Sequence, residues 1–124
     1  MFLMIQGDPR TKKNSMRVIR ANKRRMVVPS KAYEEYEKLF VVQCKLLGVD
    51  SLGINDKVNV QCEYYMKTHR KVDLTNLLSA TMDCLVSAGV LEDDNSEIVV
   101  SHDGSRVFYD KENPRVEITI ENVE

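Results

Sequence analysis

The clearest pattern along the chain is an alternation of apolar and polar residues over residues 57–67. Such an alternation places every second side chain on the same face, so it predicts a strand with one buried face. The residues of that face are Val58, Val60, Cys62, Tyr64 and Met66. Further along, leucines recur at helical spacing over residues 73–88 and predict an amphipathic helix. Asp73 is suited to be its N-cap, and Gly89 follows as its stop.

A second helical pattern follows Ser30 and ends at Gly48. Its apolar residues are Tyr33, Tyr36, Phe40, Val41, Cys44 and Leu47. Upstream, residues 1–7 are rich in residues that favour a strand, and Gly-Asp-Pro breaks this segment. The basic stretch over residues 10–28 contains two short β-like pieces, which predict a strand-loop-strand excursion. These pieces cover residues 16–19 and 25–28.

Two further strands are predicted at residues 97–101 and 106–109, on either side of an Asp103-Gly104 turn of the kind found in hairpins. Alternation predicts a last strand at residues 115–120. This order of strands and helices is typical of a mixed α/β domain of the α+β class. We therefore expect one small domain over residues 1–124, with a mixed β-sheet and two main helices.

The formal net charge of -1 conceals two opposed blocks. Residues 8–25 hold eight basic residues against one acid, a net charge of +7. Residues 73–124 hold twelve acids against three basic residues, a net charge of −9. Each block can create its own electrostatic field, and the basic block favours an anionic partner such as nucleic acid.

Other classes of protein are excluded or disfavoured by composition. No apolar stretch approaches the ~20 residues that cross a bilayer, so no membrane partner is expected. The apolar start lacks the basic region and cleavage site of a signal peptide. Three widely spaced cysteines without a Cys-x-x-Cys pair favour a reducing, cytoplasmic setting and disfavour a zinc site.

The predicted helix over residues 73–88 carries polar residues opposite its leucines. Asp73, Asn76 and Asp83 fall within about 80° of one another at a rotation of about 100° per residue. Alone, this pattern is typical of a solvated helix face with a cap. The run Glu92-Asp93-Asp94-Asn95 changes the picture, because consecutive acids repel one another and a cation offsets that repulsion.

Distance decides which of these acids can hold one ion. Asp73 and Asp83 are separated by roughly 15 Å along a helix, which is too far. If the chain reverses after the helix and returns extended, five residues cover about 16 Å and bring Asp94 toward Asn76 or Asp73. We therefore expect a cluster of Asp73 with Asp93 or Asp94. Its oxygen ligands suit Mg²⁺ or Mn²⁺ better than zinc.

Basic residues accompany this predicted cluster. The candidates for phosphate binding are Lys12, Lys13, Arg17, Arg24, Arg25, Arg70 and Lys71. A metal ion held by carboxylates beside them suits phosphodiester hydrolysis, because the ion polarises a phosphoryl oxygen and lowers the pKa of a bound water. A merely solvated charged surface stays open as the alternative.

Aromatic residues do not alternate with the residues of the basic segment, so base stacking of single strands is not expected, and contact through the DNA backbone and the shape of the junction is favoured. His69 and His102 are isolated and are assigned surface or structural roles. Tyrosines at amphipathic spacing are assigned to the core or an interface. These are Tyr33, Tyr36, Tyr64 and Tyr65.

Several motifs together resemble the RusA family of Holliday junction resolvases. They are Asp73-Leu74-Thr75-Asn76-Leu77-Leu78, Asp83-Cys84-Leu85, Ala88-Gly89-Val90-Leu91-Glu92-Asp93-Asp94-Asn95, Gly7-Asp8-Pro9 and Lys12-Lys13-Asn14. The resemblance implies a small homodimeric endodeoxyribonuclease, often prophage-encoded, that uses Mg²⁺ to cut four-way DNA junctions in recombination and repair. It also adds Asn14 to the candidate DNA-binding residues, and Asn76 and Asp83 as supporting residues of the site.

The resemblance assigns roles to single residues. Asp73 matches the first catalytic aspartate of the family, Asp94 matches the catalytic aspartate of the acidic pair, and Asp93 matches its helper. Two positions depart from the family pattern: Thr75 replaces a second aspartate, and Ser79 replaces a lysine. Two alternatives to an active nuclease follow, a junction-binding protein with weak or lost cleavage and a small protein that binds a structural cation.

Overall fold

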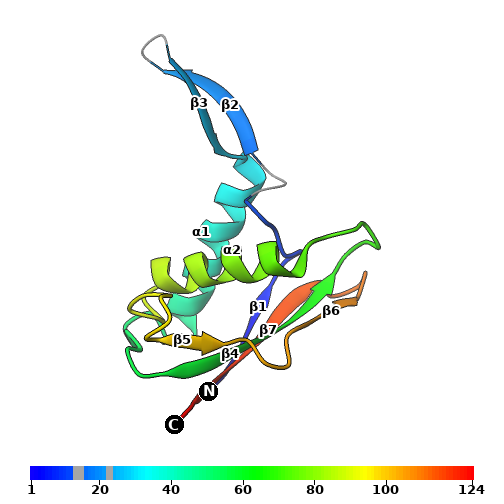
Figure 1. Cartoon of the computed structure of the whole chain (residues 1–124). Coiled ribbons are helices and arrows are strands. Elements are labelled where there is room, and N and C mark those ends of the chain that lie inside the picture. Colours follow the sequence, from blue (N-terminus) through cyan, green and yellow to red (C-terminus); the bar gives the residue numbers. More distant parts are fainter. Residues whose placement is uncertain (13–15, 22–23) are drawn as a thin grey trace.

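The structure is a computed structural model that describes residues 1–12, 16–21 and 24–124. Two helices lie over one face of a mixed sheet, and a two-stranded ribbon projects from this body (Figure 1). This arrangement confirms the predicted α+β class. Neither helix in the described ranges is long and apolar enough to cross a membrane. The elements are β1 (Phe2–Gln6), β2 (Met16–Ala21), β3 (Arg24–Pro29), α1 (Lys31–Leu46), β4 (Val58–Met66), α2 (Leu74–Ser87), β5 (Val99–Ser101), β6 (Arg106–Tyr109) and β7 (Arg115–Asn122).

The larger sheet has the strand order β1-β7-β4-β5, and β6 also pairs with β4. β7 is antiparallel to both β1 and β4, whereas β5 and β6 run parallel to β4. Parallel neighbours need a crossover connection, which here is α2. α2 therefore runs back over the sheet, from the end of β4 toward its start (Figure 1).

The predicted hairpin about the Asp103-Gly104 turn is wrong, because β5 and β6 pair with successive parts of β4 and not with each other. The side chain of Asn59 in β4 explains the difference. Its Oδ1 accepts a hydrogen bond from the backbone N–H of Asp103 at 2.7 Å, and its Nδ2 donates to the backbone oxygen of Asp103 at 3.2 Å. The turn is thus anchored to the edge of β4.

α1 begins where the sequence predicts. Ser30 is its N-cap, and the Ser30 Oγ accepts a hydrogen bond from the backbone N–H of Tyr33 at 3.2 Å. The buried residues of α1 are Tyr33, Tyr36, Phe40 and Cys44. Leu47, which the pattern assigns to the same apolar face, is instead 53% exposed. It is the C-cap, where the helix has ended and the chain turns away through Gly48.

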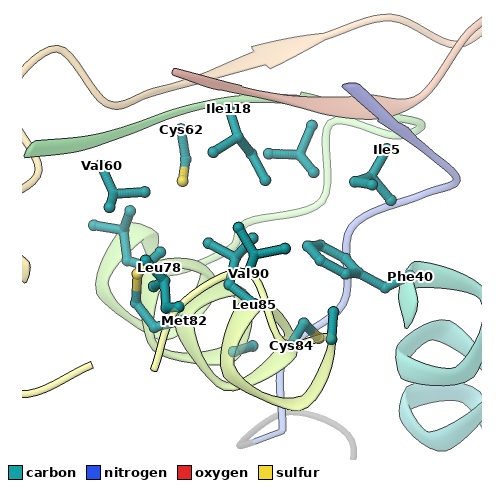
Figure 2. Close-up of a cluster of buried hydrophobic side chains, with 14 of the residues drawn as sticks. Ile5, Phe40, Val60, Cys62, Leu78, Met82, Cys84, Leu85, Val90 and Ile118 are labelled. Carbon is teal, nitrogen blue, oxygen red and sulfur yellow. The ribbon is translucent and has the colours of Figure 1, made fainter. Parts of the chain in front are cut away.

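The core lies between the sheet and the two helices, where apolar side chains from both layers interdigitate (Figure 2). Tyr64 Oη and Thr81 Oγ1 form a buried hydroxyl pair 2.7 Å apart, and Thr81 Oγ1 also donates to the Leu77 carbonyl oxygen at 2.8 Å. The three cysteines are free and buried in this layer. They are Cys44, Cys62 and Cys84.

Gly89, the predicted stop of α2, should tolerate no larger residue. Its φ is +80°, and a Cβ at this position would lie 2.1 Å from the backbone oxygen of Asp50. We expect Gly89→Ala to lower the free energy of unfolding by about 2–4 kcal/mol, through the left-handed backbone and the forced backbone shift together. The matched control is Gly48→Ala, where φ is +73° but the added Cβ meets nothing within 4 Å. Equal losses in urea denaturation would contradict the role of the Asp50 contact.

Candidate functional site

Asp73 stands at the N-cap of α2, as predicted. Its backbone is extended, with φ −92° and ψ 119°, which is the usual N-cap conformation. Its carboxylate makes no hydrogen bond to the backbone of the first helical turn. Instead, Asp73 Oδ1 accepts a hydrogen bond from Thr75 Oγ1 at 3.2 Å. The Asp73 carboxylate is therefore presented to solvent at the start of the helix.

The acidic turn after α2 is held by its own hydrogen bonds. The backbone N–H of Asp94 donates to Asp93 Oδ1 at 2.7 Å, and Asn95 Nδ2 donates to Asp93 Oδ2 at 3.0 Å. These bonds hold the pKa of Asp93 below its ordinary value. Asn95 Oδ1 in turn accepts from the backbone N–H of Glu97 at 2.9 Å. Asp93 therefore fixes the conformation of the turn that presents Asp94.

Asp94 lies close to other negative charges. Partial desolvation raises the pKa of Asp94, and the charge of Asp83 and the hydrogen bond with Asp93 raise it further. Asp83 belongs to the second half of α2, and Asp94 belongs to the turn that follows. The helix and the turn therefore each contribute a carboxylate to this negatively charged site. A bound cation would relieve the repulsion between them.

The chain after α2 takes a different path from the extended return expected from the sequence. Leu91 forms a parallel bridge with Ile54, and the backbone N–H of Glu92 donates to the Ile54 carbonyl oxygen at 2.9 Å. The charge of Asp83 in α2 contributes to the raised pKa of Asp94. In the described ranges, no three His, Cys, Asp or Glu side chains lie close enough together to hold a metal ion. The pairing of Asp73 with Asp93 or Asp94 stays a prediction.

One face of α2 links the candidate residues. Thr75, Ser79 and Asp83 follow one another at intervals of four residues, so their side chains lie on the same side of the helix. Thr75 and Ser79 are exposed, whereas Asp83 and the supporting residue Asn76 are half-buried. Lys12 Nζ donates to Asp83 Oδ2 at 3.0 Å. The basic N-terminal segment thus reaches the helix through this ion pair.

Cationic side chains gather around a cavity of about 70 Å³ beyond the end of β4. Arg10, Arg70 and Lys71 line it together with polar Thr11 and Thr68. Arg70 and Lys71, both predicted to bind DNA, are exposed and precede Asp73 by three and two residues in the chain. Such a cationic hollow can hold a phosphate group through charge-assisted hydrogen bonds. Arg10 belongs to the basic block of the sequence, but nothing in the sequence around it predicts that it lines this cavity.

The β2–β3 ribbon, which projects from the rest of the domain (Figure 1), carries further basic candidates. Arg20 and Arg25 stand directly opposite each other, and Arg24 follows in register; all three are exposed. Facing like charges repel each other, so an anion such as a DNA phosphate would stabilise this end of the ribbon. The remaining predicted DNA-binding residues are Arg17, which lies in β2, and Lys13 and Asn14, which lie outside the described residues.

Aromatic contacts near the sheet are not among the sequence-based expectations. The rings of His69 and Tyr109 stack with centroids 3.6 Å apart, and Tyr65 stacks on Phe108 at 5.0 Å. The guanidinium of Arg115 lies 3.8 Å from the centroid of the Tyr65 ring. The parallel register of β4 and β6 joins residues about 40 positions apart in the sequence, and no local pattern reveals that pairing.

These features define a class of protein. It is a small α+β domain that presents carboxylates at a helix start and at an acidic turn, and cations around a phosphate-sized cavity and along a projecting ribbon. This combination suits an enzyme acting on a phosphodiester backbone.

The family model for endodeoxyribonuclease RusA matches residues 6–121 of the 124-residue chain. The chain therefore belongs to the RusA endodeoxyribonuclease family, which confirms the resemblance seen in its sequence. Members of this family are Holliday junction resolvases, which hydrolyse phosphodiester bonds in branched DNA. Nucleases of this kind typically use a divalent metal ion. A comparison with curated proteins found no match.

Proposed function

We propose that this protein resolves four-way DNA junctions with Mg²⁺, held by Asp73, Asp93 and Asp94. The observation that carries the proposal is that the exposed carboxylates of Asp73, at the start of α2, and of Asp94, in the turn after α2, belong to a chain that matches the RusA endodeoxyribonuclease family over residues 6–121. The donors are all oxygens, which suits Mg²⁺ or Mn²⁺. Mn²⁺ is accordingly the expected substitute ion.

Different side chains have different roles in the proposed hydrolysis. When bound, the divalent ion polarises a phosphoryl oxygen and lowers the pKa of a bound water. Asp93 holds the turn in shape through its bonds to Asp94 and Asn95, so that Asp94 is already in place before DNA binds. Arg70 and Lys71 hold phosphates beside Asp73, and the arginines of the β2–β3 ribbon hold a more distant part of the same DNA.

The working form is a homodimer, because two-fold symmetry allows one subunit to act on each of two opposed strands. An exposed apolar stripe on α1 supports this part of the proposal. Leu39, Val42 and Leu46 recur at positions i, i+3 and i+7, and all three are exposed on the side of α1 that faces away from the core. We assign this stripe to contact with a second copy, and we place the dimer in the cytoplasm, where free cysteines stay reduced.

Leu46→Glu should shift the protein from dimer to monomer. Leu46 is 82% exposed, so its replacement leaves the core intact, whereas a carboxylate buried between two copies without a partner is strongly unfavourable. Sedimentation velocity measures the shift, and Leu46→Met serves as the matched control that keeps the apolar contact. If Leu46→Glu still dimerised at the concentrations at which the wild type does, the dimer interface would not include this part of α1.

A second candidate function is junction binding with little or no cleavage. It is supported by Thr75 and Ser79, which lie on the same face of α2 as Asp83 but carry neither a carboxylate nor an amine. A nuclease lacking those groups loses a possible metal ligand and a charge that stabilises the transition state.

Cleavage of a synthetic four-way junction separates the two candidates. The full chain is incubated with the junction and with a linear duplex of the same sequence, in Mg²⁺, in Mn²⁺ and in EDTA. Metal-dependent, symmetrical nicks in the junction alone support the nuclease. Salt-sensitive junction binding without nicks supports the binding protein, and failure to bind DNA at low salt contradicts both.

A further inference from the structure

We infer that the stacked pair of His69 and Tyr109 is a docking shelf for a nucleobase exposed at the branch point of a DNA junction. This inference rests on the proposed action on junctions and adds a contact with a base to the contacts with phosphates. The pair lies outside the carboxylate site, and the two rings come from different elements. His69 belongs to the loop after β4, and Tyr109 ends β6.

The shelf is built before any ligand arrives. Tyr109 is paired in register with Met66, and the backbone N–H of Asp110 donates to the Met66 carbonyl oxygen at 2.9 Å. On the other side, the backbone N–H of Arg70 donates to Thr68 Oγ1 at 3.4 Å, which shapes the loop around His69. The ring centroids are 3.6 Å apart with an interplanar angle of 27°. Strand pairing therefore holds the backbone at Tyr109, and the bond between Arg70 and Thr68 shapes the loop that carries His69.

The rings remain open to a ligand. Tyr109 is 43% exposed, and His69 is exposed as well. Together they border an open hollow whose lining includes the apolar residues Val72 and Val107 and also Arg70. A flat aromatic group fits such a hollow, because one of its faces can stack on the outer face of a ring while its edge lies against the aliphatic walls.

The cationic side chains near the two rings indicate which kind of flat aromatic ligand would bind there. Arg70 lines both this hollow and the cationic cavity that also contains Arg10 and Lys71. A ligand that places a planar base on the rings and its own phosphate on these cations is a nucleotide of a DNA strand. Bases inside a continuous duplex have both faces covered by stacking. An opened four-way junction ends its helices at the branch point, and the base faces there are free.

Fluorescence of 2-aminopurine tests the shelf directly. The base analogue is placed at the branch point of a synthetic four-way junction or in the middle of one arm, and binding is measured in EDTA so that no strand is cut. We expect wild-type protein to change the signal at the branch point but not in the arm. Tyr109→Leu should abolish that change and weaken junction binding about 5- to 100-fold, which is the range for loss of one base–aromatic stack.

Three further variants keep the test specific. Tyr109→Phe keeps the ring and should behave as the wild type, and His69→Ala should weaken junction binding in the same direction as Tyr109→Leu. Phe2→Leu removes an exposed aromatic ring from β1 and should change neither affinity nor signal. Thermal denaturation checks that each variant is folded.

The outcomes separate this inference from the proposed function. Wild-type affinity and an unchanged branch-point signal in Tyr109→Leu would overturn the shelf while leaving junction cleavage intact. An equal loss of affinity for junction and linear duplex would also overturn it, because the ring would then be a general DNA contact. A wild-type protein that does not distinguish the junction from the duplex would remove the proposed function itself, and the shelf with it.

Discussion

Junction cleavage should fall about 100-fold or more in Asp94→Asn, with little loss of DNA binding. The substitution keeps the shape of the side chain but removes the negative charge that would hold Mg²⁺, and metal-assisted hydrolysis depends on that ion for several kcal/mol of transition-state stabilisation. Binding should hold or improve, because Asp94 stands among the like charges of Asp83 and Asp93. Single-turnover cleavage in Mg²⁺ measures the rate, and binding is measured in EDTA.

The matched control is Asp103→Asn, an exposed aspartate in the turn anchored on β4. It removes the same charge from a place with no role in the proposed chemistry, so its cleavage rate should stay within about twofold of the wild type. The cleavage rate of Asp73→Asn should fall by a similar factor to that of Asp94→Asn. Cleavage by Asp94→Asn at the wild-type rate would remove Asp94 from the metal site.

The double substitution of Thr75→Asp with Ser79→Lys should raise the cleavage rate about 10-fold or more. Both positions are exposed on the face of α2 that also carries Asp83, so the new carboxylate and amine would point toward the side where Asp94 lies. A lysine four residues after an aspartate also forms a favourable pair along a helix. The same single-turnover assay measures the gain.

Each substitution alone serves as a control for the pair. Thr75→Asp without the lysine adds another negative charge beside Asp73, which Thr75 contacts, so its gain should depend on a higher Mg²⁺ concentration. Thr75→Ala is the second control, because it removes the hydrogen bond from Thr75 Oγ1 to Asp73 without adding a charge. No gain in the double variant would mean that cleavage does not depend on these two positions.

Elements with a strong internal pattern were predictable from the sequence. α1 and α2 carry their own caps and stops at Ser30, Asp73, Gly48 and Gly89, and β4 alternates over its whole length. The pairing of β5 and β6 was not predictable, because Asn59 captures the Asp103-Gly104 turn from a strand about 40 residues away. The Asp103-Gly104 dipeptide favours a hairpin only locally, and the long-range contact with the Asn59 side chain outweighs that preference.

The candidate site was predictable in its residues but not in its geometry. The run around Asp93 and Asp94 was visible, whereas the bridge of Leu91 to Ile54, which directs the turn toward Asp83, depends on a loop before β4. His69, for which the sequence predicts a surface or structural role, is exposed. Its stacking partner Tyr109 could not be found from spacing, because the contact arises only from the parallel register of β6 on β4.

The buried cysteines make this protein convenient for site-specific labelling. Burial raises the pKa of Cys44 to about 11 and that of Cys62 and Cys84 to about 12. These thiols are protonated at neutral pH, and the thiolate is the form that attacks a maleimide. In Arg20→Cys, the dye should therefore attach to the exposed end of the β2–β3 ribbon while the native cysteines stay unmodified. The ribbon can then be followed by energy transfer to a labelled junction in an otherwise natural sequence.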